Sequence, residues 1–133
     1  MLKEQWIRPN HMKEPTNKKI TAKASFVKLS PRKLRLVADA VRNMNPMQAI
    51  DSLKLLNKRA AKPIREVIMQ GVANAKNNFQ ASPASLFIES LQIEEGPRGP
   101  KRMDKSHSAR FDRGVKRKRM AHIVLRLAIK ESK

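Results

Sequence analysis

The sequence predicts an α+β fold with three helices, a set of strands and one long basic β-hairpin. Three observations predict it: alternating apolar and polar residues near both ends of the chain, three segments of helical period between them, and a basic segment between the last two strand patterns. At 133 residues the chain suits one domain with a modest core. We therefore expect an N-terminal extension over residues 1–19 and a single domain over residues 20–133.

The first strand is predicted to follow an extension of mixed composition. Residues 1–19 combine prolines, asparagines and scattered lysines without a sustained period, so they are predicted to be disordered or to fold on a partner. Over residues 20–29, apolar side chains occupy alternate positions from Ile20 to Phe26. This alternation predicts a half-buried strand with Phe26 on its apolar side.

Three helices are predicted between residues 30 and 76. The Ser30 hydroxyl is expected to cap a helix that begins at Pro31, and Asn45 precedes a second start at Pro46. The third helix is predicted over about residues 58–76, with Pro63 in its first turn. The apolar stripes predicted to face the core are Leu34, Val37, Ala38 and Val41 in the first helix, Met47, Ile50 and Leu53 in the second, and Ala61, Ile64, Val67, Ile68, Gly71, Val72 and Ala75 in the third.

Two further strands are predicted to enclose the basic segment. Residues 86–94 contain two apolar pairs that are out of phase, which indicates either a bulge near Glu89-Ser90 or burial on both faces. Residues 123–129 alternate regularly. Pairing these strands leaves a connection far longer than a hairpin loop. We therefore predict a β-hairpin arm over about residues 95–122, reaching roughly 40 Å at about 3.3 Å per residue. The glycines and prolines of residues 96–100 predict a stiff turn at its base.

The predicted arm carries a high density of positive charge. Between Arg98 and Arg119, ten residues are Lys or Arg and two are Asp, and the whole chain has a formal net charge of +19. These charges repel one another and the arm has little apolar surface to bury, so a polyanion along its length is expected to order it. Because basic residues are also spread over the rest of the chain, the sequence favours folded RNA as the partner. A merely solvated charged surface explains this composition less well, since self-repulsion of this size disfavours the compact state.

The sequence gives little support to other chemistry. There is no cysteine, which excludes disulfides and thiolate metal sites. No apolar run approaches the roughly 18 to 20 residues of a membrane span, and the N-terminus lacks a secretory apolar stretch, so we expect a soluble intracellular protein without a membrane partner. The spacing of His11, His107 and His122 matches no metal motif. We expect no enzyme activity, no cofactor, no metal and no small-molecule substrate.

Seven short motifs occur in an order that resembles one known family. They are Ser30-Pro31-Arg32-Lys33 followed by Arg35-Leu36-Val37, Lys58-Arg59-Ala60-Ala61, Ala73-Asn74-Ala75, Glu95-Gly96-Pro97, Lys101-Arg102, Ala109-Arg110-Phe111-Asp112-Arg113, and Lys118-Arg119 leading to His122-Ile123. Over roughly residues 20–130 the chain resembles the universal large-subunit ribosomal protein number twenty-two family in bacterial naming, number seventeen in the eukaryotic scheme. The resemblance implies three helices packed on a small antiparallel β-sheet, with the long hairpin inserted into ribosomal RNA.

The resemblance also implies a function and partners. The protein would be a structural constituent of the large ribosomal subunit that binds and organises large-subunit (23S-type) rRNA during assembly. Its globular body would lie near the polypeptide exit and its hairpin would line the nascent-peptide exit tunnel. The expected partners are the rRNA, neighbouring ribosomal proteins and the nascent polypeptide. The expected location is a cytoplasmic ribosome of bacterial type, with an organellar ribosome as the alternative.

Basic charge and the matched motifs together single out the candidate site residues. Those predicted to bind rRNA are Lys23, Lys28, Ser30, Arg32, Lys33, Arg35, Lys58, Arg59, Arg98, Lys101, Arg102, Lys105, Arg110, Arg113, Lys116, Arg117, Lys118, Arg119 and His122. The predicted tunnel-facing tip comprises Met103, Asp104, Lys105, Ser106, His107, Ser108, Ala109, Arg110 and Phe111. Aromatic residues are few, so systematic base stacking is not expected, and Phe111 is the aromatic predicted to stack on a base or on the arm's own backbone.

Two other classes of function remain open from the sequence. An architectural DNA-binding protein also uses a β-ribbon arm, and the Ser-Pro-basic-basic unit at Ser30 occurs in proteins that line DNA grooves. Such proteins usually form dimers, so a monomer in solution would argue against that class. An RNA-processing enzyme is the second alternative, and it predicts that replacing His107 or His122 with alanine abolishes activity.

Overall fold

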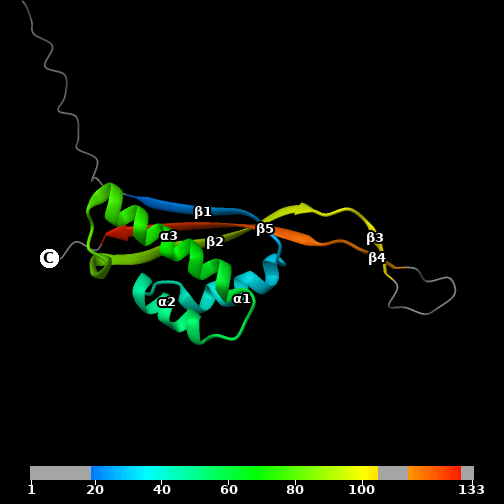
Figure 1. Cartoon of the computed structure of the whole chain (residues 1–133), viewed down its shortest axis with the longest axis horizontal. Coiled ribbons are helices and arrows are strands. Elements are labelled where there is room, and N and C mark those ends of the chain that lie inside the picture. Colours follow the sequence, from blue (N-terminus) through cyan, green and yellow to red (C-terminus); the bar gives the residue numbers. More distant parts are fainter. Residues whose placement is uncertain (1–18, 105–113, 130–133) are drawn as a thin grey trace, which may run out of the picture.

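The computed structural model describes residues 19–104 and 114–129. Three helices pack against a three-stranded antiparallel sheet from which a basic ribbon projects, which confirms the α+β fold (Figure 1). No helix within the described ranges is long and apolar enough to cross a membrane. The elements in chain order are β1 (Ile20–Val27), α1 (Pro31–Val41), α2 (Pro46–Leu55), α3 (Ala61–Phe79), the 3-10 turn η1 (Pro83–Ser85), β2 (Leu86–Arg98), β3 (Arg102–Met103), β4 (Val115–Lys116) and β5 (Arg119–Ile129).

The sheet places the last strand of the chain at its centre. Its strand order is β1-β5-β2, and both neighbours run antiparallel to β5. The predicted pairing of the last two strands is therefore confirmed. Of the two explanations for the phase change in β2, the structure shows the bulge, because the β2 register shifts between Ile88 and Ser90. This shift restores the phase of β2, so that Ile88 and Leu91 both reach the core.

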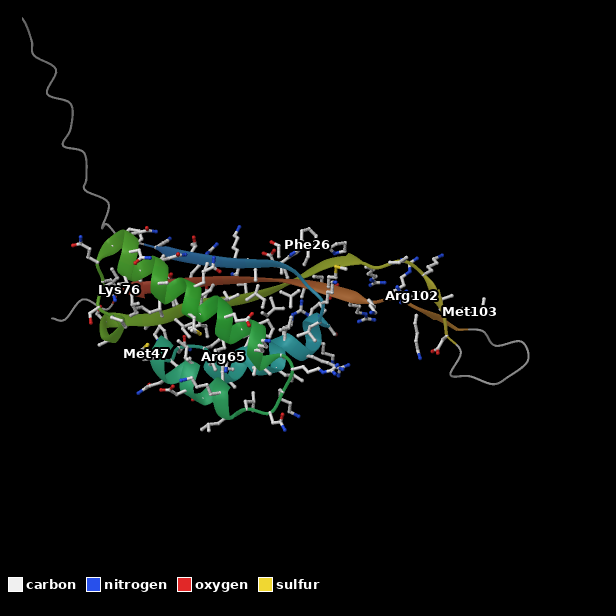
Figure 2. The ribbon with its side chains drawn as sticks, viewed as in Figure 1. Phe26, Met47, Arg65, Lys76, Arg102 and Met103 are labelled. Carbon is white, nitrogen blue, oxygen red and sulfur yellow. The ribbon has the colours of Figure 1, made fainter. Side chains whose placement is uncertain are left out.

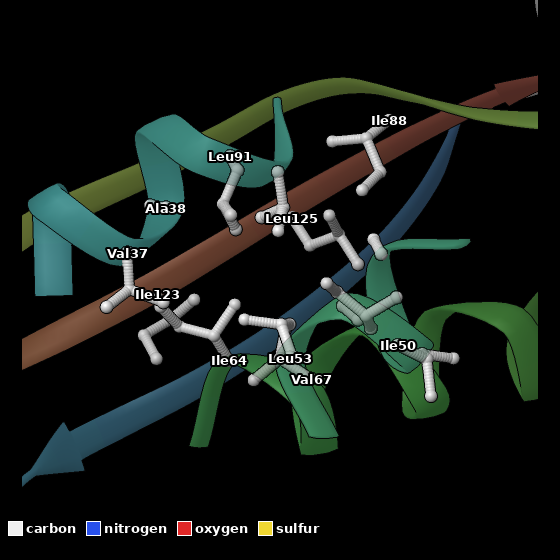
Figure 3. Packing of buried hydrophobic residues seen from close by; sticks show 14 of the residues in the cluster. Val37, Ala38, Ile50, Leu53, Ile64, Val67, Ile88, Leu91, Ile123 and Leu125 are labelled. Atoms are coloured by element: carbon white, nitrogen blue, oxygen red, sulfur yellow. The ribbon is translucent and has the colours of Figure 1, made fainter. Parts of the chain in front are cut away.

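The three helices cover one face of the sheet. The predicted stripe of α1 is buried in full, and α3 buries all of its predicted stripe except Val72, which is partly exposed. These side chains meet Ile123 and Leu125 of β5 and the buried residues of β2 (Figure 3). Burying each valine, leucine or isoleucine side chain contributes roughly 1.5–3 kcal/mol, so this interface is the main source of stability in the described part of the chain.

Three details of the helices differ from expectation. Ser30 makes no side-chain capping bond; its carbonyl oxygen instead accepts from the backbone N–H of Lys33 and of Leu34. Met47 is 47% exposed, and the buried face of α2 consists of Pro46, Ala49, Ile50 and Leu53. The third helix begins and ends three residues later than predicted, at Ala61 and Phe79, which still leaves Pro63 in the first turn.

The alternation predicted Phe26 on the buried side of β1, and this prediction is wrong. The register between β1 and β5 shifts between Ala24 and Val27, where β1 advances three residues against two in its partner. The extra residue breaks the alternation of side chains. Phe26 adopts a φ of 58° and its side chain is 59% exposed.

The stiff turn predicted at residues 96–100 is absent from the structure. Instead, β2 continues through this region to Arg98, and Gly99 N–H donates to the Lys118 carbonyl oxygen at 2.8 Å. Pro97 falls at a register shift between Glu95 and Arg98, where its missing N–H interrupts no regular ladder. A Cβ at Gly96 would lie 3.1 Å from the Met120 backbone, so glycine permits the close approach of the two strands.

Candidate nucleic-acid interface

The candidate interface is built on the ribbon that leaves the body of the protein. Beyond the sheet, β2 and β5 stay paired as far as Arg98 and Arg119, and β3 then pairs with β4 (Figure 1). Between the pairs Arg98–Arg119 and Arg102–Lys116, the outgoing strand advances four residues and the returning strand three. Extra residues of this kind bend a β-ribbon and increase its twist. The described part of the arm is therefore an irregular antiparallel ribbon.

The cations of the described arm all face solvent. They are Arg98, Lys101 and Arg102 on the outgoing strand and Lys116, Arg117, Lys118 and Arg119 on the returning strand. Side chains from both strands fan outward along the ribbon (Figure 2). Of the other predicted rRNA-binding and tip residues, Lys105, Ser106, His107, Ser108, Ala109, Arg110, Phe111 and Arg113 lie outside the described residues.

An ion pair closes the described end of the arm. The Asp104 carboxylate lies 2.6 Å from Lys116 Nζ, and the Asp104 backbone N–H donates to the Gly114 carbonyl oxygen at 2.7 Å. Asp104 is 8% exposed, whereas its neighbour Met103 is 60% exposed. Of these two predicted tip residues, Met103 therefore presents its side chain to the surroundings and Asp104 turns its carboxylate to Lys116.

The end of β1 contributes a cation to the base of the arm. A hollow of about 210 Å³, here called the arm hollow, is lined by Lys28, Gly99, Pro100, Arg102, Lys118 and Met120. Lys28 is far from the arm in sequence, yet the fold brings it beside cations of both ribbon strands. A polyanion lying along the ribbon would meet these charges together.

A second basic surface surrounds the start of α1. An apolar groove of about 570 Å³ runs between α1 and the segment before α3, with Lys33, Lys58 and Arg59 among its lining residues. Arg32 is exposed in the first turn of α1, and that turn holds no acidic residue. The helix N-terminus thus keeps its preference for an anion. Lys23 is exposed on β1 and is separate from this group.

Besides Lys116, two more of the predicted RNA-binding residues have side-chain contacts inside the protein. The Arg35 guanidinium donates to the Ile93 carbonyl oxygen at 3.2 Å and 3.4 Å and lies 4.0 Å from the Glu95 carboxylate. His122 Nδ1 accepts from the Phe26 backbone N–H at 3.1 Å. Arg35 therefore joins α1 to β2, and His122 joins β5 to the end of β1. Their contact with RNA stays a prediction.

Sequence reasoning missed Phe26 as an exposed residue of this region. The signal was present, because the apolar positions change phase after Phe26 and continue at Val27 and Leu29. A phase change of the same kind indicated the bulge in β2 as one of two explanations. The same reasoning applied to β1 would have predicted a bulge there, with Phe26 turned away from the core side.

No three His, Asp or Glu side chains gather as a metal site in the described ranges. The body of three helices on a small antiparallel sheet, with its cations on a projecting ribbon, defines an α+β protein that presents positive charge over an extended surface. Comparison with known proteins specifies the family. Residues 22–128 match the family model described as Ribosomal protein L22p/L17e.

Individual relatives agree with this match. The protein named Large ribosomal subunit protein uL22 from Rubrobacter xylanophilus is 40% identical over 111 residues, covering 83% of this chain and 84% of that protein. Its namesake from Mycoplasma mycoides is 38% identical over 104 residues, covering 78% and 91%. That from Pseudothermotoga lettingae is 35% identical over 127 residues, covering 96% and 89%. The chain belongs to the ribosomal protein L22p/L17e family, a family of structural ribosomal proteins, and is not an enzyme.

Proposed function

We propose that this chain is a structural constituent of the large ribosomal subunit that binds and organises large-subunit rRNA during assembly. The observation that carries the proposal is the arm, whose described cations are all exposed on a ribbon projecting from the body (Figure 2). Family membership supports the ribosome as the setting, and the names of the relatives support the large subunit.

The proposed mechanism requires no turnover. Cations on the ribbon, around the arm hollow and at the start of α1 neutralise phosphates that rRNA folding brings together, and the release of counterions drives binding. Because phosphates and ribose hydroxyls carry little sequence information, the protein reads mainly the shape of the RNA. Contacts from the arm and from the body then hold separate rRNA segments in one arrangement.

The same proposal assigns positions within the subunit. The globular body lies near the polypeptide exit, and the end of the hairpin, which includes Met103, lines the nascent-peptide tunnel. The partners are the rRNA, neighbouring ribosomal proteins and the passing nascent polypeptide. A long thin ribbon supports this assignment, because it carries charge into a narrow RNA channel without bringing the body with it. The ribosome is proposed to be cytoplasmic and of bacterial type, in keeping with the bacterial relatives.

Sedimentation of the tagged full chain tests the proposal. A lysate of the source cells is separated on a sucrose gradient at high salt with magnesium. Salt-resistant comigration with the large ribosomal subunit is expected, because many phosphate contacts must break together before the protein leaves. Release into light fractions, or comigration with DNA, would contradict the proposal, and the second outcome would favour an architectural DNA-binding protein.

A further inference from the structure

We infer that Phe26 is a stacking platform for one unpaired RNA base at the root of the arm. The inference rests on the proposed function and adds to it a defined nucleotide site on the protein. Phe26 lies where β1 reaches the root of the ribbon, apart from the labelled residues of the helices (Figure 2). An RNA base fits this position because aromatic side chains recognise unpaired bases by stacking.

The backbone holds Phe26 in a conformation that few residues of its kind adopt. Its φ of 58° is in the left-handed region, which is unfavourable for a side chain with a Cβ. Such strained residues persist when surrounding structure fixes them, and they concentrate at functional sites. Here the bulge between Ala24 and Val27 sets the conformation, and its result is an aromatic ring that is 59% exposed.

His122 fixes the backbone and the ring of Phe26 at the same time. Its Nδ1 accepts from the Phe26 backbone N–H at 3.1 Å, and the two rings meet edge to face with centroids 4.9 Å apart and an interplanar angle of 84°. An edge-to-face contact holds a ring while leaving much of its surface uncovered. A ring fixed in this way loses little conformational freedom when a base stacks on it.

The surroundings of Phe26 suit a nucleotide. The arm hollow adjoins it, since Lys28 follows Phe26 by two residues and Met120 precedes His122 by two on the same face of β5. A base stacked on Phe26 would place its phosphate on the side of Lys28 and the ribbon cations. Glu94, which pairs in register with His122, lies on the neighbouring strand. This combination of one fixed aromatic ring and adjacent cations matches the chemistry of a single-stranded nucleotide.

Cross-linking of the unmodified chain tests the inference directly. The full-length protein is bound to purified bacterial 23S-type rRNA, irradiated with ultraviolet light and digested, and nucleotide adducts are located by mass spectrometry. We expect an adduct on Phe26, because zero-length cross-linking requires direct contact between ring and base. Its absence in a complex that does form would overturn the inference without affecting the proposed function.

Affinity measurements on matched variants supply the second test. Phe26→Leu keeps the Cβ and the backbone bond to His122 but removes the aromatic face, and it is expected to weaken rRNA binding about tenfold. Phe26→Tyr should bind as the wild type does. Phe87→Leu makes the same change at another partly exposed phenylalanine, and no loss is expected. Thermal melting of each variant reports its folding.

The outcomes distinguish a failure of the Phe26 stacking site from a failure of the proposed function. Wild-type affinity in a folded Phe26→Leu chain overturns the stacking site, as does an equal loss in the Phe87→Leu control. Failure of the wild-type chain itself to bind 23S-type rRNA contradicts the proposed function, and that result involves no variant.

Discussion

Two arginines in the first helix, Arg32 and Arg35, carry the same charge but differ in their contacts inside the protein. Arg32 and Arg35 are both exposed and both predicted to bind rRNA, yet of the two it is Arg35 whose side chain reaches another element. Its guanidinium bridges α1 to the Ile93 carbonyl oxygen, beside Glu95. Sequence alone does not separate these residues, because the distinction depends on which strand lies across from the helix.

Replacing each arginine with alanine should separate the two roles. Arg35→Ala is expected to lower the free energy of unfolding by about 1 kcal/mol, because it removes a charge-assisted bond between two elements. Arg32→Ala should change it by less than about 0.5 kcal/mol, as an exposed surface substitution does. Urea denaturation of both variants measures the difference. Equal losses of stability would show that the Arg35 bridge contributes nothing of its own.

Gly71 is a second residue whose role depends on close packing. It is buried in α3, and an added Cβ would lie 2.8 Å from Leu125 Cδ2 and 3.1 Å from Leu127 Cδ1. Alanine favours a helix over glycine by about 1 kcal/mol, whereas overpacking of a core costs about 1–3 kcal/mol. Both leucines are fully buried and have little room to move.

We therefore expect Gly71→Ala to lower the free energy of unfolding by about 1 kcal/mol net, because overpacking exceeds the gain in helix propensity. Denaturant titration of the variant measures this change. Ala73, which is exposed on the same helix, provides the control: Ala73→Gly should cost about 1 kcal/mol from helix propensity alone. A stabilised Gly71→Ala chain would mean that the leucine side chains give way without cost.

At the scale of elements, the sequence predicted the features that depend on burial of apolar side chains. It missed those that depend on backbone hydrogen bonds. The apolar stripes of α1 and α3 follow from periodicity, and so does the bulge in β2. By contrast, the prediction ended β2 at Glu94, where alternation stops, although backbone hydrogen bonds carry the strand to Arg98. Ladder bonds require no apolar side chain, so a solvated ribbon leaves only a weak periodic signal.

The candidate site was predictable to a similar degree. Exposed cations follow from composition, and their location on an arm follows from the length of the connection between two strands. The arm hollow does not follow, because it joins Lys28 to residues that lie far along the chain. Nor does the exposure of Phe26, which results from a left-handed residue at a bulge. Both features depend on the register of β1 against β5, which the sequence pattern specified only in part.

The end of the arm has its own testable feature, the pair between Asp104 and Lys116. Asp104→Asn removes the negative charge that pairs with Lys116. Because the Lys116 side chain is mostly exposed, the loss of the ion pair should lower the free energy of unfolding by only about 1 kcal/mol. We expect faster hydrogen exchange at the Asp104 amide, which donates to Gly114. Exchange measured by NMR reports on this amide directly.

A control variant separates the effect of the Asp104–Lys116 ion pair on RNA binding from the effect of net charge. Asp51→Asn makes the same change in charge on α2, where Asp51 pairs with Lys54 at the surface. Both variants remove one negative charge, so electrostatics alone predicts slightly tighter RNA binding for each. If the ion pair organises the end of the arm, Asp104→Asn binds more weakly than Asp51→Asn. Equal affinities would show that the ion pair has no such role.

At the scale of the whole molecule, the distribution of charge determines how binding responds to salt. A net charge of +19 attracts RNA from any direction, but only cations that contact phosphates release counterions on binding. The number of such contacts is measured by the slope of the logarithm of affinity against the logarithm of salt concentration. This slope therefore distinguishes an arm that lies along RNA from one that adds only general attraction.

The prediction compares two variants with the same loss of charge. Arg102→Gln, Lys118→Gln and Arg119→Gln together remove three arm cations, and Lys54→Gln, Lys62→Gln and Lys76→Gln remove three exposed cations of α2 and α3. The slope is negative, and each lost phosphate contact reduces its magnitude by about 0.7–0.9, so the three substitutions in the arm should reduce the magnitude by about 2 to 3. The helix variant should keep the wild-type slope, with a uniform small drop in affinity from its lower net charge. Filter binding to 23S-type rRNA over a range of potassium concentrations measures both. Equal slopes for the two variants would mean that the arm acts only through its share of the net charge, and the proposed placement of the ribbon within RNA would then be wrong.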